Sequence, residues 1–440
     1  MAAVLVLNLP GHLTHDSLTQ LAEGSSGMVQ SWNPVFSSWI FGTLFNWTGG
    51  TEVIVALSAT LMAAAVLLTV AGPEASRLWA LGPIVLLLFG PILLIHPGVV
   101  WKDVWFAHLA LLGFGLVALR AQGGKWWIEP LALAFFATAL LSRQTGVLVA
   151  LIGALSLTAL QARADMGMQL QARVLRFGLG LSGRVALVLM LAVAFSSLAK
   201  SQMKQIQIGE VGTGVRLVAL FDMAGMLKRV PNAQLDRLRA AGFGTDAWEQ
   251  GARATFSPER IDRLEQRPIT GSRELTTSMI LAQWFDLVAA HPMSYASHRL
   301  EVFAWFSGLR DQARCIPIHV GIDIGPHTPN PGVQTQPARW SPTLYHWTRS
   351  YLDTPYFAPL AWNLVSIAVA GMIAWRRAWA HPVLWLQVGG LVYSLSYLAA
   401  GFSCDFRYSY FSVAAASIGL MWACANADWR RSGTPSPLGN

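Results

Sequence analysis

VIVALSATLMAAAVLLTVA, residues Val53–Ala71, is a run of nineteen residues without a single charge. A helix needs about 20 apolar residues to cross a hydrocarbon core of about 30 Å. Similar runs recur along the 440-residue chain, which is 54% hydrophobic and 12% charged, whereas soluble domains carry roughly 25% charged residues. The sequence therefore predicts an all-α, polytopic membrane protein.

The apolar runs predict nine membrane-spanning helices. They cover Val53–Ala71, Leu78–Ile95, Val104–Leu119, Trp127–Leu141, Val147–Leu160, Val185–Leu198, Tyr356–Ala374, Val383–Ala400 and Tyr408–Ala425. Met1–Leu9 is apolar too, but nine helical residues rise only about 14 Å. We expect it to be the end of a further span whose beginning is missing, so the bundle should hold nine to ten helices.

Lysines and arginines are unevenly distributed between these helices. One alternating set of short connections holds Arg77, Arg120, Lys125, Arg163, Arg173, Arg176, Arg184, Arg376, Arg377, Arg430 and Arg431. The other set holds only Lys102, Arg143 and Arg407. Because short cytoplasmic loops are enriched in Lys and Arg, the second set is assigned to the outer side. The net charge of +8 thus reflects topology, and we expect no nucleic-acid partner.

The same alternation predicts the domain organisation. Residues 1–52 form a partial first helix and a first outer loop without any cation, and residues 53–199 form the first group of spans. Residues 200–355 form a large, mostly helical extracytoplasmic domain. Residues 356–426 form the last spans, followed by a cytoplasmic tail over residues 427–440.

Local signals predict the elements of the outer domain. Ser257 and Pro258 suit the N-cap and the first position of a helix in SPERIDRLEQ, Ser257–Gln266. Val215–Leu227 is apolar enough to lie along the membrane surface as an interfacial helix. Arg310–Pro355 is rich in proline and should be an extended loop that returns to the membrane.

Asp16 and its neighbour His15 lie in the first outer loop, close to the expected membrane exit. A carboxylate in such a position can accept a proton from an attacking hydroxyl group. A helix cap or a solvated loop acid is the other interpretation, and position alone favours it.

Two further outer segments carry charge. Lys102 and Asp103 stand where an outer loop enters a helix, and ionisable groups at that depth are commonly functional or paired. A snorkelling lysine and an N-cap aspartate explain them equally well. Arg143 lies in a turn between two short helices, where its guanidinium would suit a phosphate oxyanion.

SCDFRYSYF, Ser403–Phe411, is the densest polar cluster at an outer helix end. Asp405 and Arg407 could simply pair, and Tyr408 could belong to an interfacial aromatic belt. Arg407 nevertheless begins a span on the side where cations are scarce, which suits a lipid phosphate. Cys404, next to Asp405, could bond to Cys315, since both are predicted on the oxidising side.

Motifs for ATP, nicotinamide, a serine nucleophile or a zinc hydrolase are absent from the sequence. His298 and Arg299 in HPMSYASHR read as helix surface and cap, and their spacing is unlike a zinc site. No cofactor or metal is therefore assigned from spacing.

Read in order, PGHLTHDS (Pro10–Ser17), WNPVFSSW, HPGVVWKD, HPMSYASHR and CDFRY resemble integral-membrane glycosyltransferases of the GT-C superfamily. The resemblance covers most of the chain and is closest to the bacterial branch that modifies cell-surface polysaccharides. It implies a protein of the bacterial inner membrane with its active site on the periplasmic face. It also implies a polyprenyl-phosphate-linked sugar donor and a glycan or lipid-linked acceptor.

The resemblance implies that Asp16 is the general base of an inverting transfer. Arg143 and Arg407 are then candidates for binding the lipid phosphate. The remaining candidate substrate-binding residues are His15, Lys102, Asp103, His298, Arg299, Asp405 and Tyr408. Many relatives carry an acidic pair where this chain has Asp16-Ser17, so a divalent metal is not predicted.

Two other functions remain open from the sequence. One is an O-antigen-type polymerase or ligase that uses polyprenyl-diphosphate glycans, which would call for more outer arginines. The other is a flippase or transporter of lipid-linked sugars without chemistry, a class in which internal repeats are common. No such repeat is visible in this chain.

Overall fold

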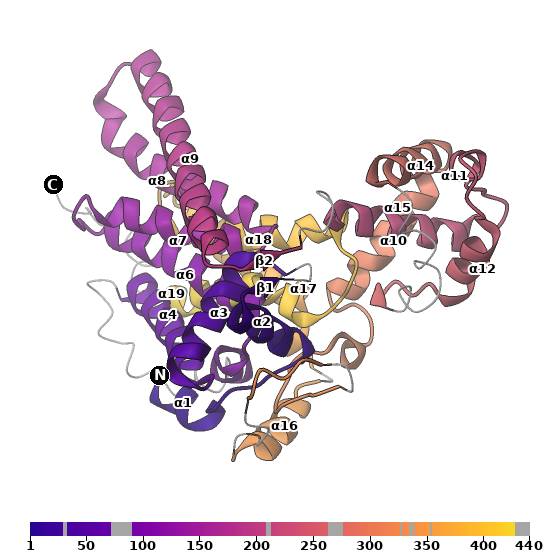
Figure 1. The fold of residues 1–440 in the computed structure, drawn as a ribbon. Helices are drawn as coiled ribbons and strands as arrows, with labels where there is room; N and C mark the ends of the chain where they lie inside the picture. The colour runs from indigo at the N-terminus through magenta and orange to yellow at the C-terminus, as the bar shows by residue number, and fades with distance from the viewer. Residues whose placement is uncertain are drawn as a thin grey trace.

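The computed structural model describes residues 1–29, 33–71, 90–207, 213–262, 276–325, 328–333, 337, 339–352 and 354–426. Figure 1 shows a bundle of long helices and, to its right, a separate group of shorter helices that includes α10, α12, α14 and α15. The only β-sheet among the described residues is a two-stranded parallel pair, β1 (Met28–Val29) with β2 (Gln205–Ile206). The architecture is therefore essentially all-α.

The bundle is arranged around α6, Lys102–Ala121, which is the most deeply buried of its long helices. Helices from both halves of the chain pack on α6. They are α4 (Glu52–Val70), α7 (Ile128–Ser142), α8 (Gly146–Ala164), α18 (Pro382–Ala400) and α19 (Tyr410–Ala425). The outer layer is formed by α9 (Leu170–Ser201) and α17 (Pro359–Trp375). One core cluster of buried apolar side chains runs through all of these helices.

Five helices in the described part of the chain are long and apolar enough to cross a membrane: α4, α6, α8, α9 and α18. Three shorter apolar helices, α7, α17 and α19, also coincide with predicted spans. The predicted span Leu78–Ile95 lies mostly outside the described residues, since only residues 90–95 are described and these are helical. The chain is thus a multi-pass membrane protein, and a count of nine to ten spans stays a prediction.

The predicted first outer loop is largely helical. It contains α2 (His15–Ser26) and α3 (Val35–Thr48), preceded by the short α1 (Ala2–Asn8). The two helices cross where Gly24 meets Gly42, and a Cβ atom on Gly42 would lie 2.0 Å from the carbonyl carbon of Gly24. The place of this segment on the outer side stays a prediction. The apolar face of α3, with Phe41 and Phe45 in the core, packs the segment against the bundle.

The helical domain predicted on the outer side, called the outer domain below, has its own core. Its helices are α10 (Thr213–Arg229), α11 (Asp236–Ala240), α12 (Asp246–Thr255), α14 (Thr277–Ala290) and α15 (Pro292–Phe306). Phe221, Met223 and Met226 of α10 are fully buried against its neighbours. The prediction of an interfacial helix over Val215–Leu227 is therefore wrong, because its apolar residues fill a protein core.

The helix predicted from Ser257 does not begin there: residues 257–261 are not helical, Asp262 is helical, and residues 263–266 of the predicted stretch lie outside the described residues. This stretch instead runs beside the Gly401–Arg407 loop. The backbone N–H of Ile261 donates to the carbonyl oxygen of Phe402 at 2.9 Å, and that of Cys404 donates to the carbonyl oxygen of Glu259 at 2.9 Å. These two bonds give the N–H group of Ile261 and the carbonyl oxygen of Glu259 partners in the loop instead of partners within a helix.

The proline-rich return segment is mostly irregular, as predicted, apart from α16 (Ser341–Arg349) and short 3₁₀ turns. It runs back to the N-terminal segment. The N–H of Leu13 donates to the carbonyl oxygen of Gly321, and the N–H of Asp323 donates to that of Leu13, both at 2.9 Å. This contact places the return segment beside the start of α2.

The Gly24–Gly42 crossing generates a testable prediction. Gly42→Ala should lower stability by about 1–3 kcal/mol, because α2 and α3 must separate to admit the methyl group. The matched control is Gly178→Ala in α9, where an added Cβ would have no neighbour within 4 Å. Thermal unfolding in detergent compares the two variants, and equal midpoints would contradict the tight crossing.

Candidate functional site

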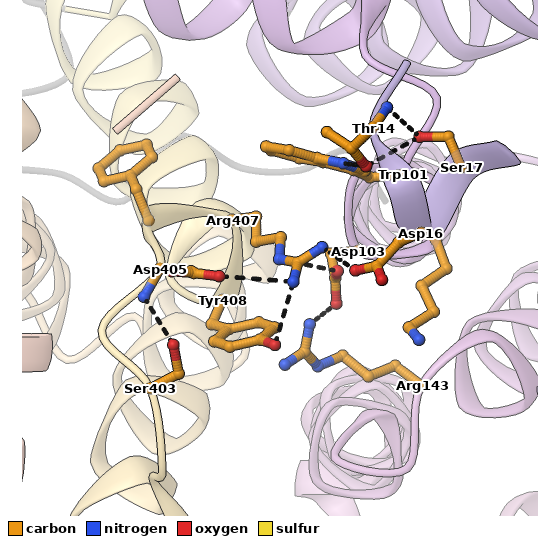
Figure 2. A network of polar contacts seen from close by, with 12 residues as sticks. Thr14, Asp16, Ser17, Trp101, Asp103, Arg143, Ser403, Asp405, Arg407 and Tyr408 are labelled. Atoms are coloured by element: carbon orange, nitrogen blue, oxygen red, sulfur yellow. Dashed lines mark hydrogen bonds and ion pairs between the residues drawn. The ribbon is translucent and has the colours of Figure 1, made fainter. Parts of the chain in front are cut away.

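Four segments that lie far apart in the sequence bring charged side chains to one place. Asp16 lies in the first turn of α2, Asp103 in the first turn of α6, and Arg143 between α7 and α8. Arg407 lies in a 3₁₀ turn, Phe406–Tyr408, just before α19. Figure 2 shows the guanidinium of Arg407 facing the carboxylates of Asp16, Asp103 and Asp405.

Arg407 is the centre of this cluster. It forms a close ion pair with Asp16 through Nη1, and its Nη2 lies 3.4 Å from Oδ2 of Asp405. Its Nε lies 4.0 Å from Oδ2 of Asp103. The guanidinium carbon also lies 5.3 Å from the ring centroid of Trp101 and 5.0 Å from that of Tyr408. The Arg407 guanidinium therefore lies close to three carboxylates and two aromatic rings.

Arg143 forms the second cationic centre. It pairs closely with Asp103, donates a hydrogen bond to the hydroxyl of Tyr397, and donates through Nε to Oγ1 of Thr145 at 3.1 Å. Its guanidinium carbon lies 4.6 Å from the ring centroid of Tyr408. Asp103 and Tyr408 thus stand between the two arginines, which makes the cluster one continuous network.

Lys102 adds a third cation. It is buried, and its Nζ donates to Oδ1 of Asn33 at 2.6 Å. Lys102 lines a cavity of about 100 Å³ together with Asp103, Arg143 and Tyr408. The snorkelling interpretation of Lys102 is therefore wrong, and the cavity wall carries ammonium and guanidinium groups suited to a small anion.

The three carboxylates differ in exposure. The Asp16 side chain keeps 29% of its accessible surface, against 2% for Asp103 and 5% for Asp405. Burial raises the pKa of Asp16, but the charges of Arg407 and Lys102 outweigh it and hold that pKa below its ordinary value of 3.8. Burial raises the pKa of Asp405 despite the opposing charges of Arg407 and Arg260. Asp16 is thus the most exposed of the three carboxylates, and its lowered pKa favours the ionised form.

The Gly401–Arg407 loop, which carries Arg407, is tied down from two directions. Cys404 is bonded to Cys315, so the predicted disulfide is confirmed. Arg260 lies 3.6 Å from Asp405, and the backbone of the loop pairs with Glu259–Ile261. The outer domain and the return segment therefore both help to position Arg407.

Three sequence-predicted site residues lie elsewhere. His15 binds Oγ1 of Thr328 in the return segment at 2.8 Å. His298 and Arg299 are buried in the outer domain, where each contacts Asp222, at 2.9 and 2.5 Å respectively. Arg299 also donates to the carbonyl oxygen of Gly401 at 2.8 Å, so it connects the outer domain to the loop that carries Arg407.

Sequence reasoning missed Tyr397, Asn33, Trp101 and Arg260. Trp101 is adjacent to Lys102, which is a signal that could have been used. Tyr397 is uncharged and stands in an ordinary apolar helix, whereas Asn33 lies in WNPVFSSW, a segment that the resemblance includes but in which no residue is charged. Among the residues that the structure describes, no group of three His, Cys, Asp or Glu side chains could hold a metal ion.

The disulfide generates a second prediction. Cys315→Ser should destabilise the protein by up to about 5 kcal/mol, because the bond closes a long loop in the unfolded chain. Thermal unfolding under non-reducing conditions measures the effect. Cys424→Ser, which removes the free cysteine of α19, is the matched control. A Cys315→Ser protein that unfolds at the wild-type temperature would show that the bond does not form.

Arg407 generates a pH prediction. In the wild type, the depressed pKa of Asp16 stabilises the fold above about pH 4, and this contribution is lost as the pH falls through the folded value. In Arg407→Gln this contribution is much reduced, because the largest charge that lowers the pKa of Asp16 is gone. The difference between the two unfolding midpoints should therefore stay constant above about pH 4 and narrow as the pH falls below about pH 4.

The matched control for this experiment is Arg237→Gln, which breaks the exposed pair with Asp286. Its midpoint should follow that of the wild type within about 1 °C at every pH, because exposed ion pairs contribute little. If the difference in unfolding midpoint between the wild type and Arg407→Gln does not change with pH, the assigned ion pair between Asp16 and Arg407 is refuted.

Comparison with known proteins gives little beyond this geometry. No protein-family model and no curated protein matches the chain. A solved structure that resembles it is the crystal structure of ArnT from Cupriavidus metallidurans bound to undecaprenyl phosphate. The identity is 15% over 97% of this chain and 77% of that chain, with a TM-score of 0.34. The likeness is distant and assigns no function.

Proposed function

We propose that the chain is a GT-C-type glycosyltransferase that moves a sugar from a polyprenyl-phosphate donor to a glycan or lipid-linked acceptor. The observation that supports this proposal most is the position of Asp16. It is the most exposed of three clustered carboxylates, and it lies beside cations that are otherwise rare in the short connections predicted on the outer side.

In the proposed reaction, an acceptor hydroxyl attacks the anomeric carbon of the donor sugar. The new C–O bond forms as the bond from that carbon to the phosphate oxygen breaks, with inversion. The hydroxyl proton goes to the carboxylate of Asp16. Because the leaving group is an anionic phosphate, Lys102, Arg143 and Arg407 can stabilise it electrostatically without a general acid.

The Asp16–Arg407 pair suggests how donor binding prepares the base. While paired, Asp16 is ionised but weakly basic, because Arg407 lowers its pKa. A donor phosphate that takes hydrogen bonds from Arg407 would weaken this pair and raise the pKa of Asp16. The carboxylate then becomes a better proton acceptor only when donor is present.

Membrane embedding fits the substrate. The cavity beside Lys102 and Arg143 lies at the ends of α6, α7 and α8, which are apolar helices of the bundle. A lipid tail can lie along these helices while its phosphate stays at the charged cluster. The return segment, held beside the start of α2, is a candidate lid over the site.

Asp16→Asn should reduce transfer from a panel of radiolabelled undecaprenyl-phosphate sugars by about 100-fold or more, the usual contribution of a general base. Undecaprenyl phosphate should still raise the unfolding midpoint of this variant, because the cations remain. Asp286→Asn, which removes an exposed carboxylate of α14, is the matched control and should transfer normally.

The same assay separates the alternatives. Transfer from diphosphate-linked oligosaccharides, with none from monophosphate-linked sugars, would indicate a polymerase or ligase instead. Movement of labelled lipid across liposomes without any product would indicate a flippase. Near wild-type transfer by Asp16→Asn would remove Asp16 from the mechanism.

A further inference from the structure

A second charged cavity lies at the opposite ends of the bundle helices. Its volume is about 1170 Å³, and it is walled by the end of α6, the start of α7, the end of α8 and the middle of α9. Three arginines line it, Arg120, Arg163 and Arg184, and all three belong to the set predicted on the cytoplasmic side. This cavity shares no lining residue with the Asp16 site.

The cavity wall carries excess positive charge. Glu129 pairs with Arg184 at 2.7 Å, and Gln161 accepts a second bond from Arg184 at 2.8 Å. Among the residues that the structure describes, no carboxylate of the lining faces Arg120 or Arg163. Three guanidinium groups against one carboxylate leave the wall with two uncompensated positive charges.

Two buried N–H groups in this wall have no acceptor in the described part of the chain. They are Nε of Arg120 and Nε of Arg184. A buried guanidinium N–H without an acceptor is unfavourable, and a phosphate oxygen is a strong acceptor for it. Arg120 also donates through Nη1 to the carbonyl oxygen of Gly124 at 3.2 Å. The two arginines would gain an acceptor for Nε if their side chains turned toward an anion bound in the cavity.

The rest of the lining distinguishes a lipid from a small ion. Leu157, Leu160 and Met166 supply an apolar wall beside the arginines. The volume exceeds the roughly 300–1,000 Å³ of small-molecule pockets, so a free phosphate would leave most of it empty. Basic cavities between membrane helices on the cytoplasmic side are suited to anionic lipid headgroups.

We propose that this cavity binds the phosphate headgroup of an anionic phospholipid from the cytoplasmic leaflet, with Arg120, Arg163 and Arg184 as its ligands. The bound headgroup lies where the ends of α6 and α8, the start of α7 and the middle of α9 meet; Figure 1 shows α8 and α9 side by side at the upper left. This site concerns lipid recognition and does not depend on the activity proposed for Asp16.

The test uses the full-length protein in detergent, titrated with phosphatidylglycerol and followed by native mass spectrometry and thermal unfolding. Phosphatidylglycerol should raise the wild-type midpoint more than phosphatidylcholine does. Arg120→Gln/Arg163→Gln should bind it roughly tenfold more weakly or worse, since two charged contacts are lost. Arg173→Gln/Arg176→Gln removes the same charge from α9 outside the cavity and should bind within about twofold of wild type.

Three outcomes would overturn the proposal. They are equal stabilisation of the wild type by the two lipids, equal binding by the two double variants, and displacement of phosphatidylglycerol by inorganic phosphate at matched concentration. The last outcome would assign the cavity to free phosphate. If Arg120→Gln/Arg163→Gln fails to fold, the proposal is still tested by two measurements. They are phosphatidylglycerol binding by Arg163→Gln alone and the comparison of the two lipids on the wild-type protein. Asp16→Asn should retain lipid binding, which separates this proposal from the proposed transfer.

Discussion

The ion pairs around Arg407 are the constraint on which the rest of this structure depends. A largely desolvated guanidinium needs nearby anions, and breaking one buried partnership typically costs several kcal/mol. Its three carboxylate neighbours come from α2, from α6 and from its own loop. Satisfying this one cation therefore requires the N-terminal helices, the central helix and the last hairpin to meet at a single point.

Hydropathy predicts the long helices of the bundle well, because a membrane span is specified locally by composition. Val53–Ala71, for example, coincides with α4 to within one residue at each end. Hydropathy gives a wrong prediction where an apolar helix is buried in a protein core instead of contacting the membrane. Val215–Leu227 has a composition that suits a membrane surface, yet its side chains fill the outer domain. At Ser257 a sound N-cap signal is overridden by backbone pairing with a loop some 145 residues away, as tertiary context often overrides local preference.

For the site, charge asymmetry was the informative signal. It placed Asp16, Asp103, Arg143 and Arg407 on one predicted side of the membrane, and the structure brings these four together. It could not tell which acid pairs with which base, because pairing depends on contacts between distant segments. Charge asymmetry does not identify Tyr397 or Asn33, because a count of charged residues does not include uncharged side chains. The sequence predicts that His298 and Arg299 bind substrate, but in the structure both contact Asp222. Arg299 also donates a hydrogen bond to the carbonyl oxygen of Gly401.

The bond between Cys315 and Cys404 has a consequence for biogenesis. It ties the segment next to Arg407 to the start of the return segment, just after α15. On the proposed topology, in which both cysteines face the oxidising side, this bond can form only after the two thiols have crossed the membrane. The loop that carries Arg407 would then be held in place only after export, so the proposed activity would depend on an oxidation step that follows insertion of the helices.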